Sequence, residues 1–245
     1  MPVEPALRDP AVLADALFAG RPLRLAVVGY TVTRERAHPT WAEALLDGLI
    51  DAVTPARLGV VTSPTTRAGS VDRVATLTAL RRDVPVLHVT CAAFAKAARA
   101  AEIAVPAERA AWSRVPRLVL PTRAAYADAG AAASNALLVL GGGPQATMDF
   151  ACAARRGHRV ALAVDPQLSA PPWDAAGERP LNAPRYLAAQ RDAWRKGDAP
   201  PWPELACVSA KQRARWAAGW DDAVGVFEGG DPWALARRVA GWLAP

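Results

Sequence analysis

The residues whose types and spacing suit chemistry best form the run GGGPQAT, Gly141–Thr147, directly after an apolar segment. Glycine lets the backbone take positive φ and pass close to a ligand. Pro144 suits the first position of a helix, where free N–H groups and the positive dipole end attract an anion. A tight turn that binds nothing is the alternative. The residues expected to hold a phosphate here are Gly141, Gly142, Gly143, Gln145 and Thr147.

A second run, TSPTTRAGS at residues 62–70, is also predicted to bind phosphate. It supplies hydroxyl groups, one guanidinium group and a Gly-Ser pair directly before a helical segment. Ser70 as a plain helix N-cap and Arg67 as a solvated loop arginine are equally open interpretations. Gly29 follows another apolar segment and belongs to the same expected site. The contributors predicted outside the glycine run are therefore Gly29, Thr62, Ser63, Arg67, Gly69 and Ser70.

Six short apolar runs must supply the strands that position these loops. Each is apolar nearly throughout, which is typical of strands covered on both faces of a parallel sheet. The fold class predicted is α/β, a doubly wound, mostly parallel, Rossmann-like sheet in which ligands bind outside the carboxyl ends of the strands. The expected strands are Leu23–Val28, Leu58–Val61, Val84–Val89, Arg117–Leu120, Ala136–Leu140 and Val160–Val164.

The segments between these runs carry helix start and stop signals. Thr40 and Glu43 form a capping-box pattern, Ser70 and Thr122 are N-cap types, and Gly157 is a typical helix end. The expected helices are Ala44–Val53, Val71–Arg82, Arg123–Ala133 and Gln145–Arg156.

The composition changes after Asp165, since the following stretch is proline-rich and seven of the nine tryptophans lie beyond it. We expect residues 1–165 to form a Rossmann-like nucleotide-binding core and residues 166–245 to form a Trp/Pro-rich C-terminal extension packed on it. Within the extension the pattern predicts a helix at Arg185–Lys196, a late strand at Ala223–Phe227 and an amphipathic helix at Pro232–Leu243.

Two stretches resemble the SLOG superfamily, which joins the Lonely Guy phosphoribohydrolases and the DNA-processing protein A fold. They are TSPTTRAGSVDRVATLTAL and AAASNALLVLGGGPQATMDFACAARRGHRVALAVDP, and the resemblance covers roughly residues 23–166. It implies a nucleotide-binding protein that holds a nucleoside phosphate or an ADP-ribose-like ligand by its phosphate.

The sequence departs from the phosphoribohydrolase motif PGGxGTxxE at several positions. Leu140 stands in place of the proline, Ala146 in place of the glycine before the threonine, and Phe150 where the glutamate would fall. Asp149 is one residue earlier, which is a rotation of about 100° around a helix, so its side chain is expected to point away from the pocket. The resemblance therefore implies phosphate binding, with N-glycosidic hydrolysis as a variant in which Asp149 is the candidate catalytic residue.

Other catalytic candidates are sparse. Glu35 and Asp72 are weaker candidates for the catalytic acid or base of the same hydrolysis. The sequence contains no recognisable Ser–His–Asp or HExxH pattern. His88 lies inside an apolar run and is more typical of a core histidine, whereas His38 is the histidine expected nearest a pocket. Cys91 follows a predicted strand and is expected to be buried and inert.

Composition limits the class of protein. Apolar types make up 52% of the chain, which excludes a disordered protein, and the net charge of +6 permits an anionic partner without requiring one. Three cysteines without a CxxC pair give no zinc framework, so no metal and no cofactor are expected. The start MPVEPALRDP has no signal-peptide pattern and no window suits a membrane span. We expect a cytoplasmic protein, and a homodimer as the commonest assembly.

The alternative function is a DNA-binding module of the DNA-processing protein A kind. Arginines alternate with tryptophans in KQRARWAAGW at Lys211–Trp220, and Arg237 and Arg238 lie beyond. Such residues pair with phosphates and stack on bases. An ordinary amphipathic helix with Trp216 and Trp220 on its buried face explains the same pattern.

Overall fold

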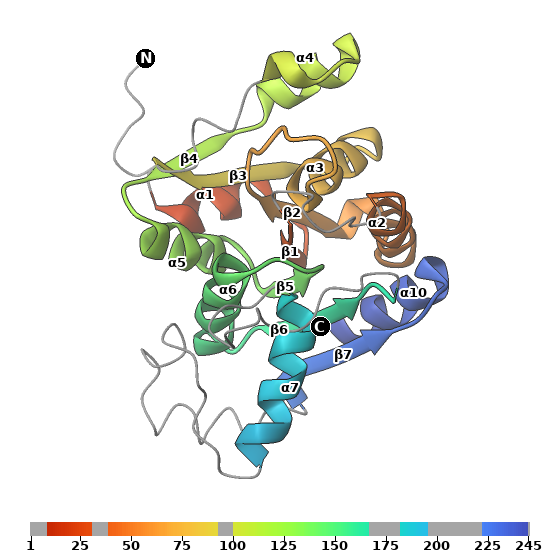
Figure 1. Ribbon diagram of the computed structural model, residues 1–245. Coiled ribbons are helices and arrows are strands. Elements are labelled where there is room, and N and C mark those ends of the chain that lie inside the picture. The colour runs from red at the N-terminus through yellow and green to blue at the C-terminus, as the bar shows by residue number, and fades with distance from the viewer. Residues whose placement is uncertain (1–8, 31–38, 93–99, 167–181, 196–221, 245) are drawn as a thin grey trace.

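The described residues form an α/β fold in which a sheet of seven parallel strands has helices on both faces (Figure 1). The computed structural model describes residues 9–30, 39–92, 100–166, 182–195 and 222–244. The predicted doubly wound parallel sheet is confirmed. Its strands are β1 Leu23–Val28, β2 Leu58–Thr62, β3 Val86–Cys91, β4 Arg117–Leu120, β5 Ala136–Val139, β6 Arg159–Val164 and β7 Val224–Glu228.

Helices α1, α5, α6 and α7 cover one face of the sheet and α2, α3 and α10 cover the other (Figure 1). Each face has its own cluster of buried side chains, which is why the central strands β2 and β5 are buried at every position. The helices are α1 Pro10–Leu17, α2 Pro39–Val53, α3 Val71–Arg81, α4 Pro106–Arg114, α5 Arg123–Ala133, α6 Pro144–Arg155, α7 Ala183–Arg195 and α10 Pro232–Leu243, with short 3-10 turns η2 Pro55–Arg57 and η4 Ala100–Glu102.

The strand order β4-β3-β2-β1-β5-β6-β7 reverses its direction between β1 and β5. The chain first builds outward from β1 to β4, then returns to lay β5 on the other side of β1. Such a reversal is the topological switch point of a doubly wound sheet, where crossovers leave the sheet on opposite faces and a crevice opens at the carboxyl ends of the strands. The residues that follow β1 and β5 therefore line the mouth of this crevice.

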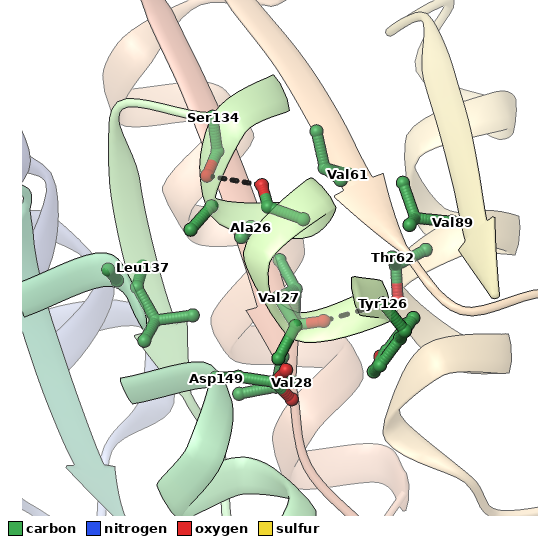
Figure 2. Close-up of a pocket in the computed structure, with 14 residues that line it drawn as sticks. Ala26, Val27, Val28, Val61, Thr62, Val89, Tyr126, Ser134, Leu137 and Asp149 are labelled. Atoms are coloured by element: carbon green, nitrogen blue, oxygen red, sulfur yellow. Dashed lines mark hydrogen bonds between the residues drawn. The ribbon is translucent and has the colours of Figure 1, made fainter. Parts of the chain in front are cut away.

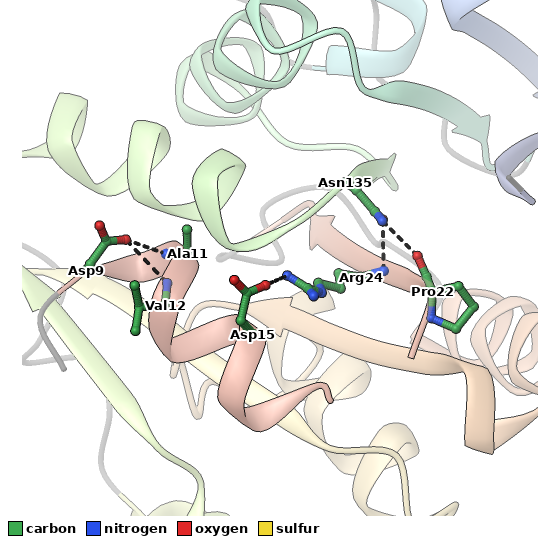
Figure 3. A network of polar contacts seen from close by, with 7 residues as sticks. All are labelled: Asp9, Ala11, Val12, Asp15, Pro22, Arg24 and Asn135. Carbon is green, nitrogen blue, oxygen red and sulfur yellow. Dashed lines mark hydrogen bonds and ion pairs between the residues drawn. The ribbon is translucent and has the colours of Figure 1, made fainter. Parts of the chain in front are cut away.

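Asn135 joins β1 to β5 at the opposite, amino-terminal edge (Figure 3). Its Oδ1 accepts from the Arg24 amide at 2.9 Å and its Nδ2 donates to the Pro22 carbonyl at 2.7 Å. The Asn135 amide donates in turn to the Arg24 carbonyl at 2.9 Å. The Arg24 side chain is paired with Asp15 of α1. The Asn135 side chain thus extends the β1–β5 pairing at the amino-terminal end of the ladder, before its first pair Leu25 and Ala136.

Most predicted helix ends are confirmed by their caps. Ser70 accepts from the Arg73 amide at 3.2 Å and Thr122 from the Ala125 amide at 3.1 Å. Gly157 follows α6 with φ +73°, a conformation that favours glycine.

Several predicted boundaries differ from the structure; α7, for example, begins at Ala183 and not at Arg185, and the differences at α2 and β3 have a clear cause. Helix α2 begins at Pro39, so Thr40 lies inside the helix and no capping box forms; Glu43 is paired with Arg81 of α3 instead. Strand β3 is shifted by two residues and ends at Cys91, because pairing with β2 and β4 decides its register. Cys91 is therefore the last strand residue, fully buried as expected, and not part of a loop.

The segment after residue 165 contributes to the same sheet. Strand β7 pairs with β6 in parallel, and α10 packs against α2, where Gly48 leaves room for Trp233 and Ala236. A division of the chain at residue 165 remains a prediction. Trp173, Trp202 and Lys211–Trp220 lie outside the described residues.

Among the helices that the structure describes, none has both the length and the apolar character needed to cross a membrane.

We predict that Asn135→Ala lowers the free energy of unfolding by about 1–2 kcal/mol, because two side-chain hydrogen bonds are lost. Chemical denaturation would measure this. Asn135→Asp keeps the acceptor for the Arg24 amide but turns a carboxylate oxygen toward the Pro22 carbonyl, so this variant should also be less stable than the wild type. Equal stability of the Ala variant and the wild type would contradict the role given to Asn135.

Candidate functional site

The glycine run after β5 lies beside Gly29, the residue that follows β1. Val28 and Val139 are partners in the β1–β5 ladder, so the two exits emerge next to each other. Gly141 and Gly142 have φ of +114° and +92°. A Cβ on Gly142 would stand 2.9 Å from the Gly29 carbonyl oxygen. The turn thus requires glycine at both positions, by conformation and by close approach.

Tyr30 connects this turn to the second predicted loop. Its ring lies over Gly141, where a Cβ would come within 2.0 Å of it, and its carbonyl accepts from the Val71 amide of α3 at 2.9 Å. A Cβ on Gly29 would in turn stand 2.6 Å from the Val71 side chain. Gly29 therefore allows α3 to approach the switch point, a packing reason for its being glycine.

Helix α6 begins at Pro144 with no side-chain cap. Gly143 occupies the N-cap position and has no side-chain oxygen to accept from the first-turn amides. In α3 and α5, by contrast, the side chains of Ser70 and Thr122 serve as caps. Within the described part of the chain, the backbone amides of Gln145 and Ala146 have no hydrogen-bond acceptor. The hydroxyl of Thr147 donates to the Pro144 carbonyl at 2.8 Å and its side chain is fully buried, so it stabilises the first turn.

The start of α7 closes over the same turn. The Ala183 amide donates to the Gly142 carbonyl at 2.9 Å. Asn182 is 1% exposed, and its Oδ1 accepts from the Arg185 amide at 3.4 Å as the helix begins. Its Nδ2 then has no acceptor among the described residues. A buried, unpaired donor beside the glycine turn is costly unless a ligand or a water molecule satisfies it.

The second loop, residues 62–70, is organised by Asp72 of α3. The Thr62 hydroxyl lies 3.0 Å from the Asp72 carboxylate and the Ser63 amide donates to it at 3.4 Å. Ser70 serves as the N-cap, the plainer of its two interpretations. Gly69 has φ +77°. Arg67 is exposed.

Asp149 points into the protein, toward the ends of β1 and β2. It lines a small cavity with Val28, Thr62 and Tyr126, and Figure 2 shows it beside Val28. Gln145 donates to its carboxylate at 3.3 Å. The cavity holds about 20 Å³, enough for one water molecule and far too little for a nucleotide. The adjacent Phe150 is fully buried in the core. That Asp149 points away from a ligand pocket stays a prediction.

Burial dominates the electrostatics of this region. Desolvation raises the pKa of Asp149 to about 8, and the nearby Asp72 charge adds to the rise. Desolvation likewise raises the pKa of Asp72 to about 7, although hydrogen bonds from Thr62 and Ser63 act against it. The pKa of Tyr126 is raised by burial and by both carboxylates. Near neutral pH, protonation of these acids therefore limits the negative charge beneath the switch point.

The remaining sequence candidates lie elsewhere or outside the described residues. His88 is a core histidine, as predicted; its Nε2 lies 3.0 Å from the Thr76 hydroxyl and its ring 4.9 Å from that of Trp112. Burial lowers the pKa of His88 to about 3. Glu35 and His38 are outside the described residues. Arg238 donates to the Glu228 carbonyl at 3.3 Å and lies over the Phe227 ring.

Sequence reasoning missed Tyr30 and Asn182, which contact the glycine turn from two other segments. Tyr30 carried one signal, since it directly follows Gly29 at a strand exit. Asn182 carried none, because its place beside Gly142 arises only from the packing of α7.

Comparisons with known proteins give a fold likeness only. No protein-family model matches the chain, and no curated protein matches it in sequence. The molybdenum cofactor carrier protein from Chlamydomonas reinhardtii has a TM-score of 0.49 and 15% identity, over 92% of this chain and 100% of that chain. DNA processing protein A from Helicobacter pylori, described as binding single-stranded DNA, has a TM-score of 0.44 and 13% identity, over 71% and 75% of the two chains.

We predict that the protein loses stability as pH rises from about 6.5 to about 8. The raised pKa values of Asp72 and Asp149 mean that the folded state holds protons that the unfolded state has already released. His88 and His158, whose pKa values are lowered by burial, act oppositely, but chiefly below their ordinary value of 6.5. Thermal unfolding across this range would measure the slope.

Asp149→Asn should flatten that slope, because one of the two titrating acids is removed. Asp128→Asn, a change on the exposed surface of α5, is the matched control and should keep the wild-type slope. An Asp149→Asn protein with the full wild-type pH dependence would show that Asp149 does not titrate in this window.

Proposed function

We propose that this protein binds a nucleoside phosphate or an ADP-ribose-like ligand, with the phosphate at the uncapped start of α6. The observation that carries the proposal is the meeting of Gly29 with Gly141 and Gly142 at the switch point between β1 and β5. A helix that starts there without a side-chain cap offers amide hydrogens and a positive dipole end to an anion.

The unpaired amide of Asn182 supports the same ligand from the other side of the turn. Its Nδ2 is a hydrogen-bond donor without an acceptor among the described residues, next to the residue whose amide binds Gly142. Phosphate oxygens are acceptors only, so a phosphate at α6 suits both sets of donors. The raised pKa values of Asp72 and Asp149 favour their neutral forms, which reduces repulsion of a bound anion.

We propose ligand binding in preference to N-glycosidic hydrolysis. A catalytic acid or base must reach the ribosyl bond within hydrogen-bonding distance. Asp149 is 8% exposed and lines a cavity the size of one water molecule. This position favours a role in which Asp149 positions the glycine turn through its hydrogen bond with Gln145. A nucleotide panel would show no release of free base under this proposal.

DNA binding is the weaker candidate on the described residues. Arg238 is held by Glu228 and Phe227, and Lys211–Trp220 lies outside the described residues. A homodimer also stays a prediction.

Gly143→Asp tests the phosphate site directly. An aspartate at the N-cap accepts from the first-turn amides and places a negative charge where the phosphate would bind. We expect wild-type protein to gain thermal stability with a panel of AMP, GMP, CMP, UMP and ADP-ribose, since a ligand of the native state raises its stability. The Gly143→Asp variant should bind the same ligand at least tenfold more weakly, so its melting temperature should rise less at the same ligand concentration.

Gly143→Asn is the matched control, because asparagine caps the same amides with nearly the same shape but no charge. It should weaken binding less than the aspartate does. If no member of the panel shifts the melting temperature of the wild type at millimolar concentration, the proposed function is wrong.

A further inference from the structure

We propose a second, separate ligand site: a cavity between α2, α10 and the start of β1 that binds a small phosphomonoester through Arg57 and Arg237. The cavity holds about 300 Å³ of space, the lower end of the range typical of small-molecule sites. Its lining residues are Pro22, Leu23, Ala52, Val53, Arg57, Arg237, Ala240, Gly241 and Ala244.

The two arginines are the polar side chains of an otherwise apolar lining. Arg57 comes from η2, after the end of α2, and Arg237 from the middle of α10. Neither guanidinium has an ion pair or a hydrogen bond among the described residues. The nearby arginines differ: Arg24 is paired with Asp15, and Arg159 donates to the Trp242 and Ala244 carbonyls at 2.8 and 2.7 Å.

The charge of the cavity selects the ligand class. Two guanidinium groups carry two positive charges, and a phosphomonoester carries about −1.5 to −2 at pH 7. Guanidinium also forms paired hydrogen bonds to phosphate oxygens, a geometry that ammonium lacks. The apolar lining, with Leu23, Val53 and Ala240, suits a compact carbon body attached to that phosphate. A monoanionic carboxylate of the same shape would match only one of the two charges.

This cavity is distinct from the glycine turn. Leu23 begins β1 at the amino-terminal edge of the sheet and Gly29 follows its carboxyl end. Leu23 and Gly29 are six residues apart along extended β1, which separates them by roughly 20 Å at a rise of about 3.3 Å per residue. The site is therefore independent of the proposed nucleotide site, and either can fail without the other.

Phenyl phosphate is a suitable probe, because it combines a dianionic phosphate with a compact apolar ring. Isothermal titration with the full chain should give saturable binding to wild-type protein, with benzoate binding at least tenfold more weakly. The Arg57→Gln/Arg237→Gln double variant should bind phenyl phosphate at least tenfold more weakly than wild type. The Arg114→Gln/Arg238→Gln double variant removes the same charge elsewhere and should stay within twofold of wild type.

Gly241→Leu tests the cavity itself without removing a charge. A Cβ on Gly241 meets no atom within 4 Å, so leucine fills space that is open, and it is a better helix former than glycine. This variant should keep its fold and lose phenyl phosphate binding. Gly143→Asp should bind the probe as wild type does, which separates this site from the glycine turn.

Equal binding by wild type, the Arg57/Arg237 double variant and Gly241→Leu would overturn the proposal. Equal loss in both double variants would also overturn it, because the probe would then respond only to the overall charge.

Discussion

The pairing of β1 with β5 is the constraint on which the site depends. The paired residues Leu25 and Ala136 are 111 positions apart in the sequence, and the same ladder holds Val28 beside Val139. Their exits, Gly29 and Gly141, then meet at one point. A Cβ on Gly142 would stand 2.9 Å from the Gly29 carbonyl oxygen, and a Cβ on Gly29 would stand 2.6 Å from Val71 of α3, so the crowded exits leave no room for side chains there. The glycines are a consequence of that contact as much as a provision for a ligand.

A second consequence concerns the two buried acids. Asp72 enters from the start of α3 and Asp149 from the second turn of α6, and each approaches the sheet where the strands end. Among the described residues, neither carboxylate has a cationic partner that lowers its pKa, so burial dominates and both pKa values rise. Burial of these carboxyl groups therefore lowers the free energy of unfolding at high pH, where both groups must ionise. The raised pKa values reduce the negative charge of these two groups near neutral pH, which lowers the repulsion of an anion at the proposed α6 site.

The two ends of the sheet differ in their chemistry. The carboxyl edge offers backbone amides, a helix start and protonatable acids, whereas the amino edge offers unpaired guanidinium groups over an apolar cavity. A backbone cradle binds phosphate by geometry and dipoles, and arginines bind it by charge and paired hydrogen bonds. The two proposed anion sites differ in construction and are physically compatible because the strands keep them apart.

The sequence by itself determined the strands, most helix ends and the place of the glycine turn. These features depend on residues that are close together in the sequence, so the sequence shows them directly. They are the apolar runs, the N-cap residues Ser70 and Thr122, Pro144 at the helix start and Gly157 at the helix end. Only the tertiary structure decided the register of β3, the start of α2, the burial of Asp149 and the place of Asn182 beside Gly142. These depend on partners far along the chain, and packing energies between distant segments leave no local pattern to read.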